Sequence, residues 1–205
     1  MLAGCGGGGT AIVQSVSVTV ATTASTVDAT DSVTLTASVD NDKNSAGVTW
    51  SVSGGGALSN QTTSSAVYTA PAASSSALTV TVTATSVADT TKLASETLTV
   101  PAAPSITTTA TQLASSVGSA YSVTLAGSGG IAPYTWKATG LPACLTLSTS
   151  GVLSGSIQAS CAGTTTPTFT LTDSGSATAL TASQQLSVVI AAAPAISFTG
   201  WITAT

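Results

Sequence analysis

The chain has 205 residues, of which only 5% are charged, and it carries a net charge of −4 and no His. Its length suffices for two domains of about 100 residues, each with its own core. A nucleic-acid ligand and a polybasic membrane patch are excluded, because both need clustered Lys or Arg, and Ser-His-Asp or Cys-His catalysis is excluded by the missing His.

Residues 1–14 are expected to be a flexible tether, because four Gly follow Cys5. The stretch Leu2-Ala3-Gly4-Cys5 resembles the lipobox of bacterial lipoproteins, in which the Cys becomes the acylated N-terminus. This resemblance implies a lipid on Cys5 and attachment to an outer membrane. Basic and apolar segments normally precede a lipobox, so we expect a start codon placed too late or a cut just before the motif. The alternative is an ordinary thiol in a flexible tail.

Residues 15–100 alternate apolar and polar side chains in short runs, which is typical of half-buried strands. Clusters of Asp, Asn, Gly and Pro separate the runs and predict turns. The predicted strands contain Val16, Val18 and Val20; Val33, Leu35, Ala37 and Val39; Val48, Trp50 and Val52; Tyr68; Leu78, Val80, Val82 and Ala84; and Leu98 and Val100. Short strands at this spacing, with a Trp on the third, predict an Ig-like β-sandwich.

Residues 101–104, Pro-Ala-Ala-Pro, form a short, stiff hinge, and the pattern restarts in residues 105–190. The predicted strands contain Ile106; Tyr121, Val123 and Leu125; Tyr134 and Trp136; Leu145 and Leu147; Val152 and Leu153; Phe169 and Leu171; and Leu186, Val188 and Ile190. Residues 127–130 are predicted to form a turn. The sequence therefore predicts an all-β chain of two tandem immunoglobulin-like β-sandwiches.

An internal repeat places a further strand at the C-terminus. Pro104-Ser105-Ile106 recurs ninety residues later as Pro194-Ala195-Ile196, so residues 191–205 are predicted to be a hinge and the first strand of a truncated third repeat. Alternatively, this orphan strand closes onto the second domain or onto a neighbouring molecule. Its apolar side chains are the predicted interaction residues: Ile196, Phe198, Trp201 and Ile202.

Two known families resemble the two halves of the chain. Residues 15–100 resemble bacterial Ig-like (Big) domains, through the stretches 40–52 and 68–71. Residues 104–190 resemble the putative-Ig, cadherin-like repeat of acidobacterial and related surface proteins, through Gly140-Leu141-Pro142, residues 151–155 and residues 171–174. Members of these families are usually spacers, adhesive modules or stalks in long extracellular proteins.

Cys144 and Cys161 remain to form a disulfide if Cys5 carries a lipid, and an oxidising compartment favours that bridge. Cys144 departs from the residues usual in the cadherin-like repeat, which suggests a domain-specific disulfide. The alternative is two buried free thiols. A zinc site is disfavoured, because the Cys residues are far apart and there is no His.

No cofactor is expected, although calcium is a candidate. Cadherin-like repeats bind calcium at domain junctions through carboxylate and carbonyl oxygens, and the candidate ligands here are Asp40, Asp42 and Asp173. However, the hinge supplies no carboxylate, and Asp and Asn side chains also make turns by bonding their own backbone. We expect turns at these positions in preference to a calcium site.

Taken with the resemblances, these features predict a non-catalytic extracellular structural or adhesive protein, a lipid-anchored stalk of Ig-like domains at a bacterial surface. Its partners would be neighbouring Ig-like domains or identical subunits. One alternative is a filament subunit joined by strand complementation, with residues 10–20 or 196–202 as donor strands. Another is a carbohydrate-binding module of a larger secreted protein, with glycans as partners. Trp50 and Trp136 argue against it, because their alternation with apolar neighbours predicts core positions.

Overall fold

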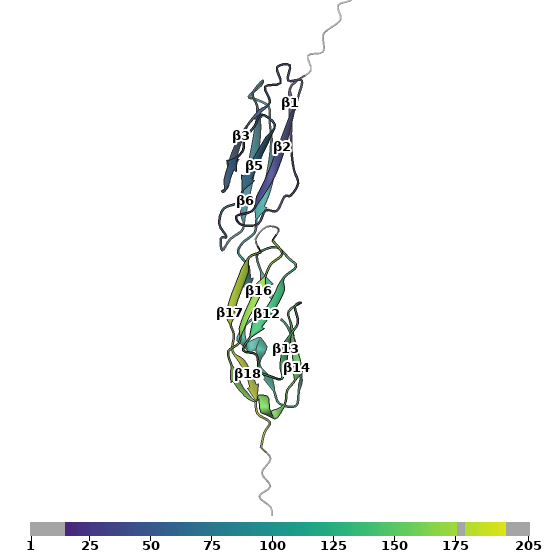
Figure 1. Cartoon of the computed structure of the whole chain (residues 1–205), viewed down its shortest axis with the longest axis vertical. Helices are drawn as coiled ribbons and strands as arrows, with labels where there is room; N and C mark the ends of the chain where they lie inside the picture. The colour runs from purple at the N-terminus through teal and green to yellow at the C-terminus, as the bar shows by residue number, and fades with distance from the viewer. Residues whose placement is uncertain (1–14, 176–178, 196–205) are drawn as a thin grey trace, which may run out of the picture. The chain divides into compact units, whose positions relative to one another are not determined.

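A computed structural model describes residues 15–175 and 179–195 of the chain (Figure 1). These residues form strands and two 3-10 turns, and the chain divides into two compact units. Unit 1 comprises Met1–Ala72 and Leu78–Val100, and unit 2 comprises Ala73–Ala77 and Pro101–Thr205. Within the described residues, no helix is long and apolar enough to span a membrane.

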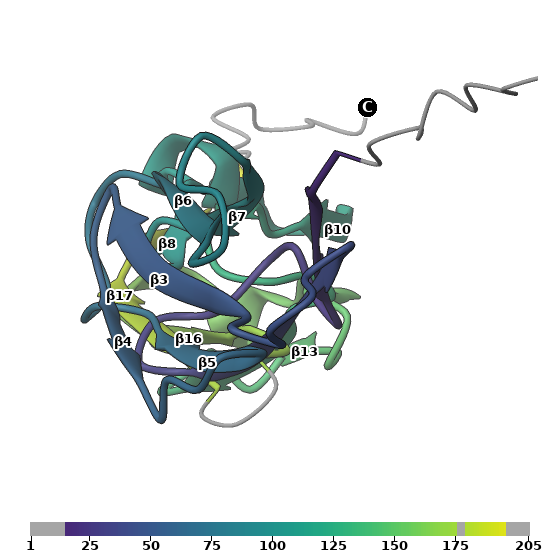
Figure 2. The same ribbon diagram turned by 90° about the horizontal axis from the view of Figure 1, so that it is seen from above.

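Unit 1 is a seven-stranded sandwich. One sheet has the order β1 (Ser17–Thr22), β2 (Ser32–Asp40), β5 (Ser65–Thr69), β4 (Ala57–Ser59), and the other has the order β3 (Val48–Ser53), β6 (Leu78–Ser86), β7 (Leu93–Val100). All neighbouring strands within these sheets are antiparallel. In Figure 2, β4 and β5 lie on one side of the unit and β3, β6 and β7 on the other. This is the strand order of a constant-type Ig sandwich.

The core of unit 1 follows from the period-2 alternation in its strands. On β6, Val80, Val82 and Ala84 are fully buried, whereas the intervening Thr side chains keep contact with solvent. Leu35 on β2 and Tyr68 on β5, in the other sheet, are also fully buried, as is Leu98 on β7 beside Val80. Burying a side chain of this size contributes about 1.5–3 kcal/mol, so the alternation specifies which face of each sheet is turned inward.

Unit 2 is a sandwich of shorter strands. The first layer has the strand order β10 (Ala120–Thr124), β14 (Val152–Ser156), β13 (Leu145–Leu147). A separate two-stranded sheet is formed by β8 (Ser105–Ile106) and β11 (Gly127–Ser128). The second layer contains β12 (Thr135–Thr139), β16 (Thr168–Thr172), β17 (Thr181–Gln185), and a three-stranded sheet with the order β15 (Gly163–Thr165), β18 (Val188–Ala191), β9 (Ser115–Ser116). The turns are η1 (Ala110–Leu113) and η2 (Ala159–Cys161). The fold class predicted from the sequence is therefore confirmed.

The last predicted strand of unit 2 corresponds to β18, which contains Val188 and Ile190, and a separate strand, β17, precedes it and has a different partner. β17 pairs with β16, and β18 pairs with β15. The change coincides with Pro167, which lies between β15 and β16 and whose carbonyl accepts the Leu186 N–H at 3.2 Å. Proline has no N–H to donate to a ladder, so a single continuous pairing cannot pass this point.

The predicted turn at 127–130 is partly a strand. Gly127–Ser128 pairs with Ser105–Ile106, and only Gly129 and Gly130 turn, with φ of 72° and 58°. A Cβ on Gly127 would collide with the Leu171 side chain. The prediction of a turn from a Gly-rich run was therefore wrong for its first half, where Gly allows two layers to approach closely.

Replacing Tyr68 by Phe is expected to raise the free energy of unfolding of unit 1 by up to about 1 kcal/mol, because a buried hydroxyl without a partner costs stability. Burial raises the pKa of Tyr68, and among the described residues its hydroxyl has no hydrogen-bond partner. The matched control is Tyr134→Phe in unit 2, which removes a hydrogen bond to the Gly129 carbonyl and should cost about 1 kcal/mol. Urea denaturation of each variant measures both. A clear loss of stability in Tyr68→Phe would contradict the prediction.

Candidate functional site

The chain that enters unit 1 is bonded to the strand that leaves it. After β1, Thr26 forms a parallel bridge with Thr99 on β7. The Val27 N–H donates to the Thr99 carbonyl at 3.0 Å, and the Thr99 N–H donates to the Ser25 carbonyl at 2.8 Å. We call residues 25–27 and Thr99 the terminal pair of unit 1.

Unit 2 has an equivalent arrangement. Here β9, which follows β8 and η1 along the chain, runs parallel to the last strand β18, the leaving strand, with Ser115 opposite Ile190 and Ser116 opposite Ala191. The Val117 N–H adds a bond to the Ala191 carbonyl at 3.0 Å. We call β9 with β18 the terminal pair of unit 2. Ile190, within β18, and Leu113, two residues before β9, are both buried in the core of the unit.

Parallel pairing determines how each terminal pair responds to tension. When the chain is pulled by its two ends, the earlier strand of each terminal pair is drawn toward its own N-terminus, and the later, leaving strand is drawn toward its own C-terminus. Two parallel strands then slide along each other, so their hydrogen bonds are loaded together. In an antiparallel hairpin pulled from one end, the bonds would instead open one after another. The geometry of both units can therefore resist extension of the chain.

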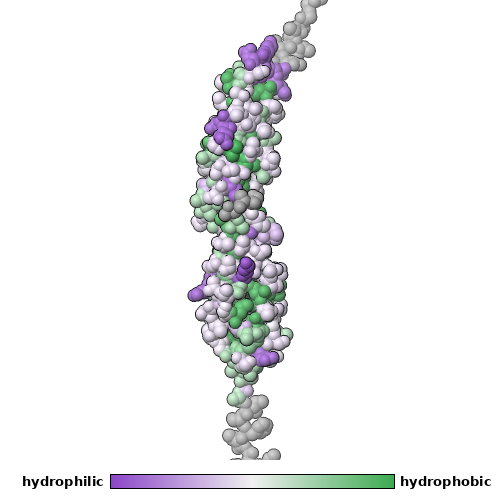
Figure 3. Space-filling model, viewed as in Figure 1, coloured by the Kyte–Doolittle hydropathy of each residue, from purple (hydrophilic) through white to green (hydrophobic). Residues whose placement is uncertain are grey.

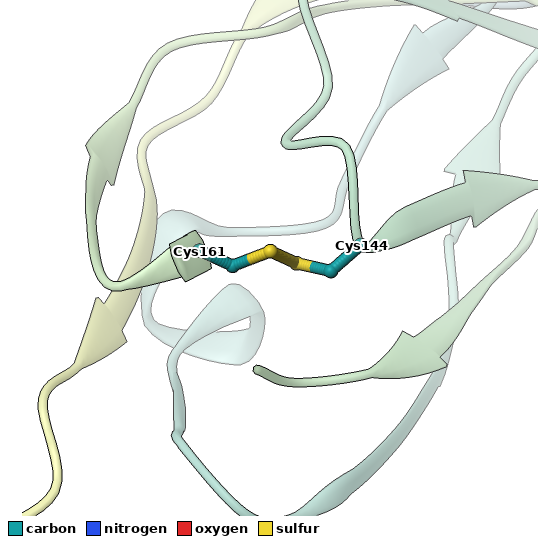
Figure 4. The surroundings of a disulfide bond; sticks show 2 residues. All are labelled: Cys144 and Cys161. Carbon is teal, nitrogen blue, oxygen red and sulfur yellow. A yellow bond between two sulfur atoms is a disulfide. The ribbon is translucent and has the colours of Figure 1, made fainter. Parts of the chain in front are cut away.

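A disulfide joins Cys144 to Cys161 in unit 2, with a Cα–Cα distance of 6.3 Å and a sequence separation of 17 residues (Figure 4). Cys144 lies directly before β13, and Cys161 ends η2. Both side chains are half-buried and pack against the core of the unit. These are the two residues that the sequence left as candidates for a bridge.

The three candidate calcium ligands lie in separate surroundings. In unit 1, the Asp40 carboxylate accepts the Ser17 hydroxyl at 3.2 Å, whereas the Asp42 carboxylate accepts the backbone N–H of Gly47 at 2.7 Å and of Asn44 at 3.3 Å. Asp173 belongs to unit 2. In residues 15–175 and 179–195, no three His, Cys, Asp or Glu side chains gather where they could hold a metal ion.

Asp42 organises the loop between β2 and β3. The Gly47 N–H is the main reason that the pKa of Asp42 lies below its usual value, and further N–H groups of the loop act in the same direction. A hollow of about 300 Å³ opens beside it, lined by Ala37, Ser38, Val39, Asp42, Ser45, Gly47, Thr63 and Ser64. The carboxylate is engaged by its own loop, as expected of a turn residue.

The two Trp residues predicted to lie in the core differ in burial. Trp136 on β12 is 4% exposed, whereas Trp50 on β3 is half-buried and donates its indole N–H to the Thr62 carbonyl at 3.0 Å. Both pack against the core of their unit. Each ring therefore contributes to the packing of its own unit.

Several predicted site residues lie outside the described part of the chain. They are Cys5, the predicted lipid attachment, and the predicted interaction residues Ile196, Phe198, Trp201 and Ile202.

Most of the described surface is of intermediate hydropathy, with small hydrophilic and hydrophobic areas on the face drawn in Figure 3. Exposed hydroxyl groups pair across neighbouring strands in both units: Thr19 with Ser38 at 2.7 Å, Thr83 with Ser95 at 2.8 Å, and Thr170 with Ser183 at 2.9 Å. Such cross-strand pairs contribute a few tenths of a kcal/mol each. Hydroxyl pairs thus occupy outward positions where other proteins carry ion pairs.

A family model described as Putative Ig domain matches residues 103–191. The matched residues lie in unit 2, whose fold is an Ig-like β-sandwich. Similar solved structures include a C-terminal 282-residue fragment of intimin in complex with the intimin-binding domain of its receptor, at 19% identity and a TM-score of 0.43, covering 86% of this chain and 64% of that chain. An I-band fragment of titin is 11% identical, with a TM-score of 0.44, covering 86% of this chain and 66% of that chain.

The N-terminal eight Ig domains of Down Syndrome Cell Adhesion Molecule are 18% identical, with a TM-score of 0.36, covering 87% of this chain and 25% of that chain. The chain thus spans less than two thirds of each of these three structures. The search of curated proteins finds no match.

Proposed function

We propose that this chain is a non-catalytic extracellular structural protein, a stalk of Ig-like domains that carries tension at a bacterial surface. The observation that supports the proposal is the parallel terminal pair in each unit, Thr26 with Thr99 and β9 with β18. A spacer that only separates two points needs no particular pairing between the first and last strands of its domains. A spacer under tension benefits from bonds that are loaded together.

The chemistry of the described residues fits an extracellular setting. Structural disulfides persist mainly in oxidising compartments, and Cys144 is bonded to Cys161. Asp42, Asp89 and Asp173 each accept hydrogen bonds from their own or neighbouring loops, so these carboxylates serve the fold. Surface hydroxyl pairs give the sheets a neutral exterior, which suits neighbouring domains packed closely in an array.

Pulling the full chain by its two ends is expected to unfold unit 1 at a higher force than pulling it between the N-terminus and position 90. The first geometry loads the terminal pair in shear. In the second geometry the force enters at position 90, in the turn before β7, so both strands of the parallel terminal pair are pulled from the same end and their bonds open one after another. Single-molecule force measurements on the same chain, with handles at either set of positions, make this comparison. Equal forces in the two geometries would refute the load-bearing role.

In this proposal, Cys5 carries the lipid that attaches the stalk to the outer membrane. The support is the lipobox-like stretch that ends at Cys5 and the Gly-rich tether behind it. Intact-mass analysis of protein extracted from membranes should show a diacylglycerol adduct on Cys5, and replacing Cys5 by Ser should release the protein from the membrane fraction. A free Met1 N-terminus on the extracted protein would exclude the anchor.

A further inference from the structure

The disulfide of unit 2 connects its two layers next to the strand on which tension acts. Cys144 precedes β13 in the first layer, and Cys161 lies two residues before β15 in the second. β15 is the antiparallel neighbour of the leaving strand β18, with Gly163 opposite Ile190 and Thr165 opposite Val188. The bridge therefore ties the direct neighbour of the leaving strand to the opposite layer.

The same bridge closes a loop that contains β13 and β14. The chain from Cys144 to Cys161, a sequence separation of 17 residues, would span about 60 Å if it were extended. With the bridge intact, tension passes from Cys144 to Cys161 across a Cα–Cα distance of 6.3 Å. The hairpin of β13 and β14 is then outside the path of the force, even after every hydrogen bond of the unit has broken.

We propose that the Cys144–Cys161 disulfide limits the length to which tension can extend unit 2, and that a dithiol reductant releases the remaining length. This inference rests on the proposed load-bearing function. The length held back is the extended loop less the width of the bridge, which is about 50–55 Å. Unit 2 thus has two maximum extended lengths. The shorter one is set by the disulfide, and the longer one is reached after the disulfide is reduced.

The release step is thiol–disulfide exchange. A thiolate of the dithiol attacks one of the two sulfur atoms, forms a mixed disulfide and expels the other Cys as a thiolate, which takes up a proton. The second thiol of the reductant then closes onto its own mixed-disulfide sulfur and frees the first Cys. Two electrons and two protons pass from the dithiol to the two Cys residues. The chain gains extended length only when unit 2 has also been unfolded by force. In the folded unit, β14 stays paired with both β13 and β10.

The test is single-molecule extension of the full chain held by its two ends. The oxidised chain should give a contour increment for unit 2 that is about 50–55 Å shorter than that of the Cys144→Ser, Cys161→Ser double variant. Unit 1 is the internal standard, because the bridge lies outside it, and its increment should be the same in both chains. Equal increments for unit 2 in the two chains would overturn the inference.

A second measurement needs no variant. At constant force in dithiothreitol, the oxidised chain should show an additional step of about 50–55 Å after unit 2 has unfolded and none before it. An additional step that occurs while unit 2 is still folded would overturn the proposed limit. These readouts are lengths, whereas the load-bearing function is tested by force in two pulling geometries. A correct increment with equal forces would therefore refute that function and leave the length limit standing.

Discussion

Replacing Asp173 by Ala is expected to lower the free energy of unfolding of unit 2 by about 3–5 kcal/mol. The Asp173 side chain is 4% exposed, and its carboxylate accepts three backbone N–H groups, from Leu180 at 2.7 Å, Ile131 at 3.2 Å and Gly175 at 3.3 Å. It thereby holds the loop before β12 to the loop after β16. Ala would leave these donors without an acceptor in a buried place, and each such loss costs about 1–3 kcal/mol.

Urea denaturation followed by Trp fluorescence measures this loss, because each unit contains a core Trp, Trp50 in unit 1 and Trp136 in unit 2. The transition of unit 1 should not move, which separates a local effect from a general one. Asp173→Asn is the matched variant. It keeps one oxygen acceptor of the same shape, so its loss should be about half as large. A loss below about 1 kcal/mol in Asp173→Ala would mean that water replaces the carboxylate and that the loops do not depend on it.

Alternation of apolar and polar residues was sufficient to predict most of the strands. Val80, Val82 and Ala84 lie on the buried face of β6, and Phe169 and Leu171 lie on the buried face of β16, as the period of two requires. The restart of this alternation after residues 101–104 predicted two units. These signals are local or periodic, and they can be read without knowing which strands pair.

The terminal pair of unit 2 could not be predicted in this way. β9 consists of two Ser residues, which carry no apolar alternation, and its partner β18 lies more than 70 residues further along the chain. Leu113 is fully buried from a 3-10 turn, where no period of two applies. The partner change at Pro167 also depends on which strands meet, and strand pairing is a property of the folded layers.

The candidate site shows the same division. The pairing of Cys144 with Cys161 could be proposed by counting Cys residues, whereas the position of the bridge beside the leaving strand needed the structure. Trp50 and Trp136 were both predicted to occupy core positions, because both alternate with apolar neighbours. The structure buries Trp136 and leaves Trp50 half-buried, with the indole N–H of Trp50 bonded to the Thr62 carbonyl.

Replacing Trp136 by Ala is expected to cost unit 2 about 3–5 kcal/mol, the usual range for removing a buried Trp. Its indole packs closely on the backbone of Gly151, where a Cβ would come within 2.8 Å of the ring. Gly151 also has a φ of 89°, which side chains rarely adopt. Gly151→Ala should therefore destabilise the same unit by about 1–3 kcal/mol, through strain and overpacking against the ring.

Trp50→Ala is the matched control in unit 1 and should cost about 1.5–3 kcal/mol, because less apolar area is lost and one hydrogen bond is removed. Chemical denaturation of the two variants compares the two positions directly. If both substitutions cost the same, burial does not determine the contribution of the third-strand Trp. If Trp136→Ala costs more, the two Trp side chains contribute unequally to the free energy of unfolding, although the sequence predicted core positions for both. The difference matters for the proposed function, because unit 2 also carries the disulfide. In the proposed stalk, the bridge between Cys144 and Cys161 would limit how far unit 2 extends once this core has opened.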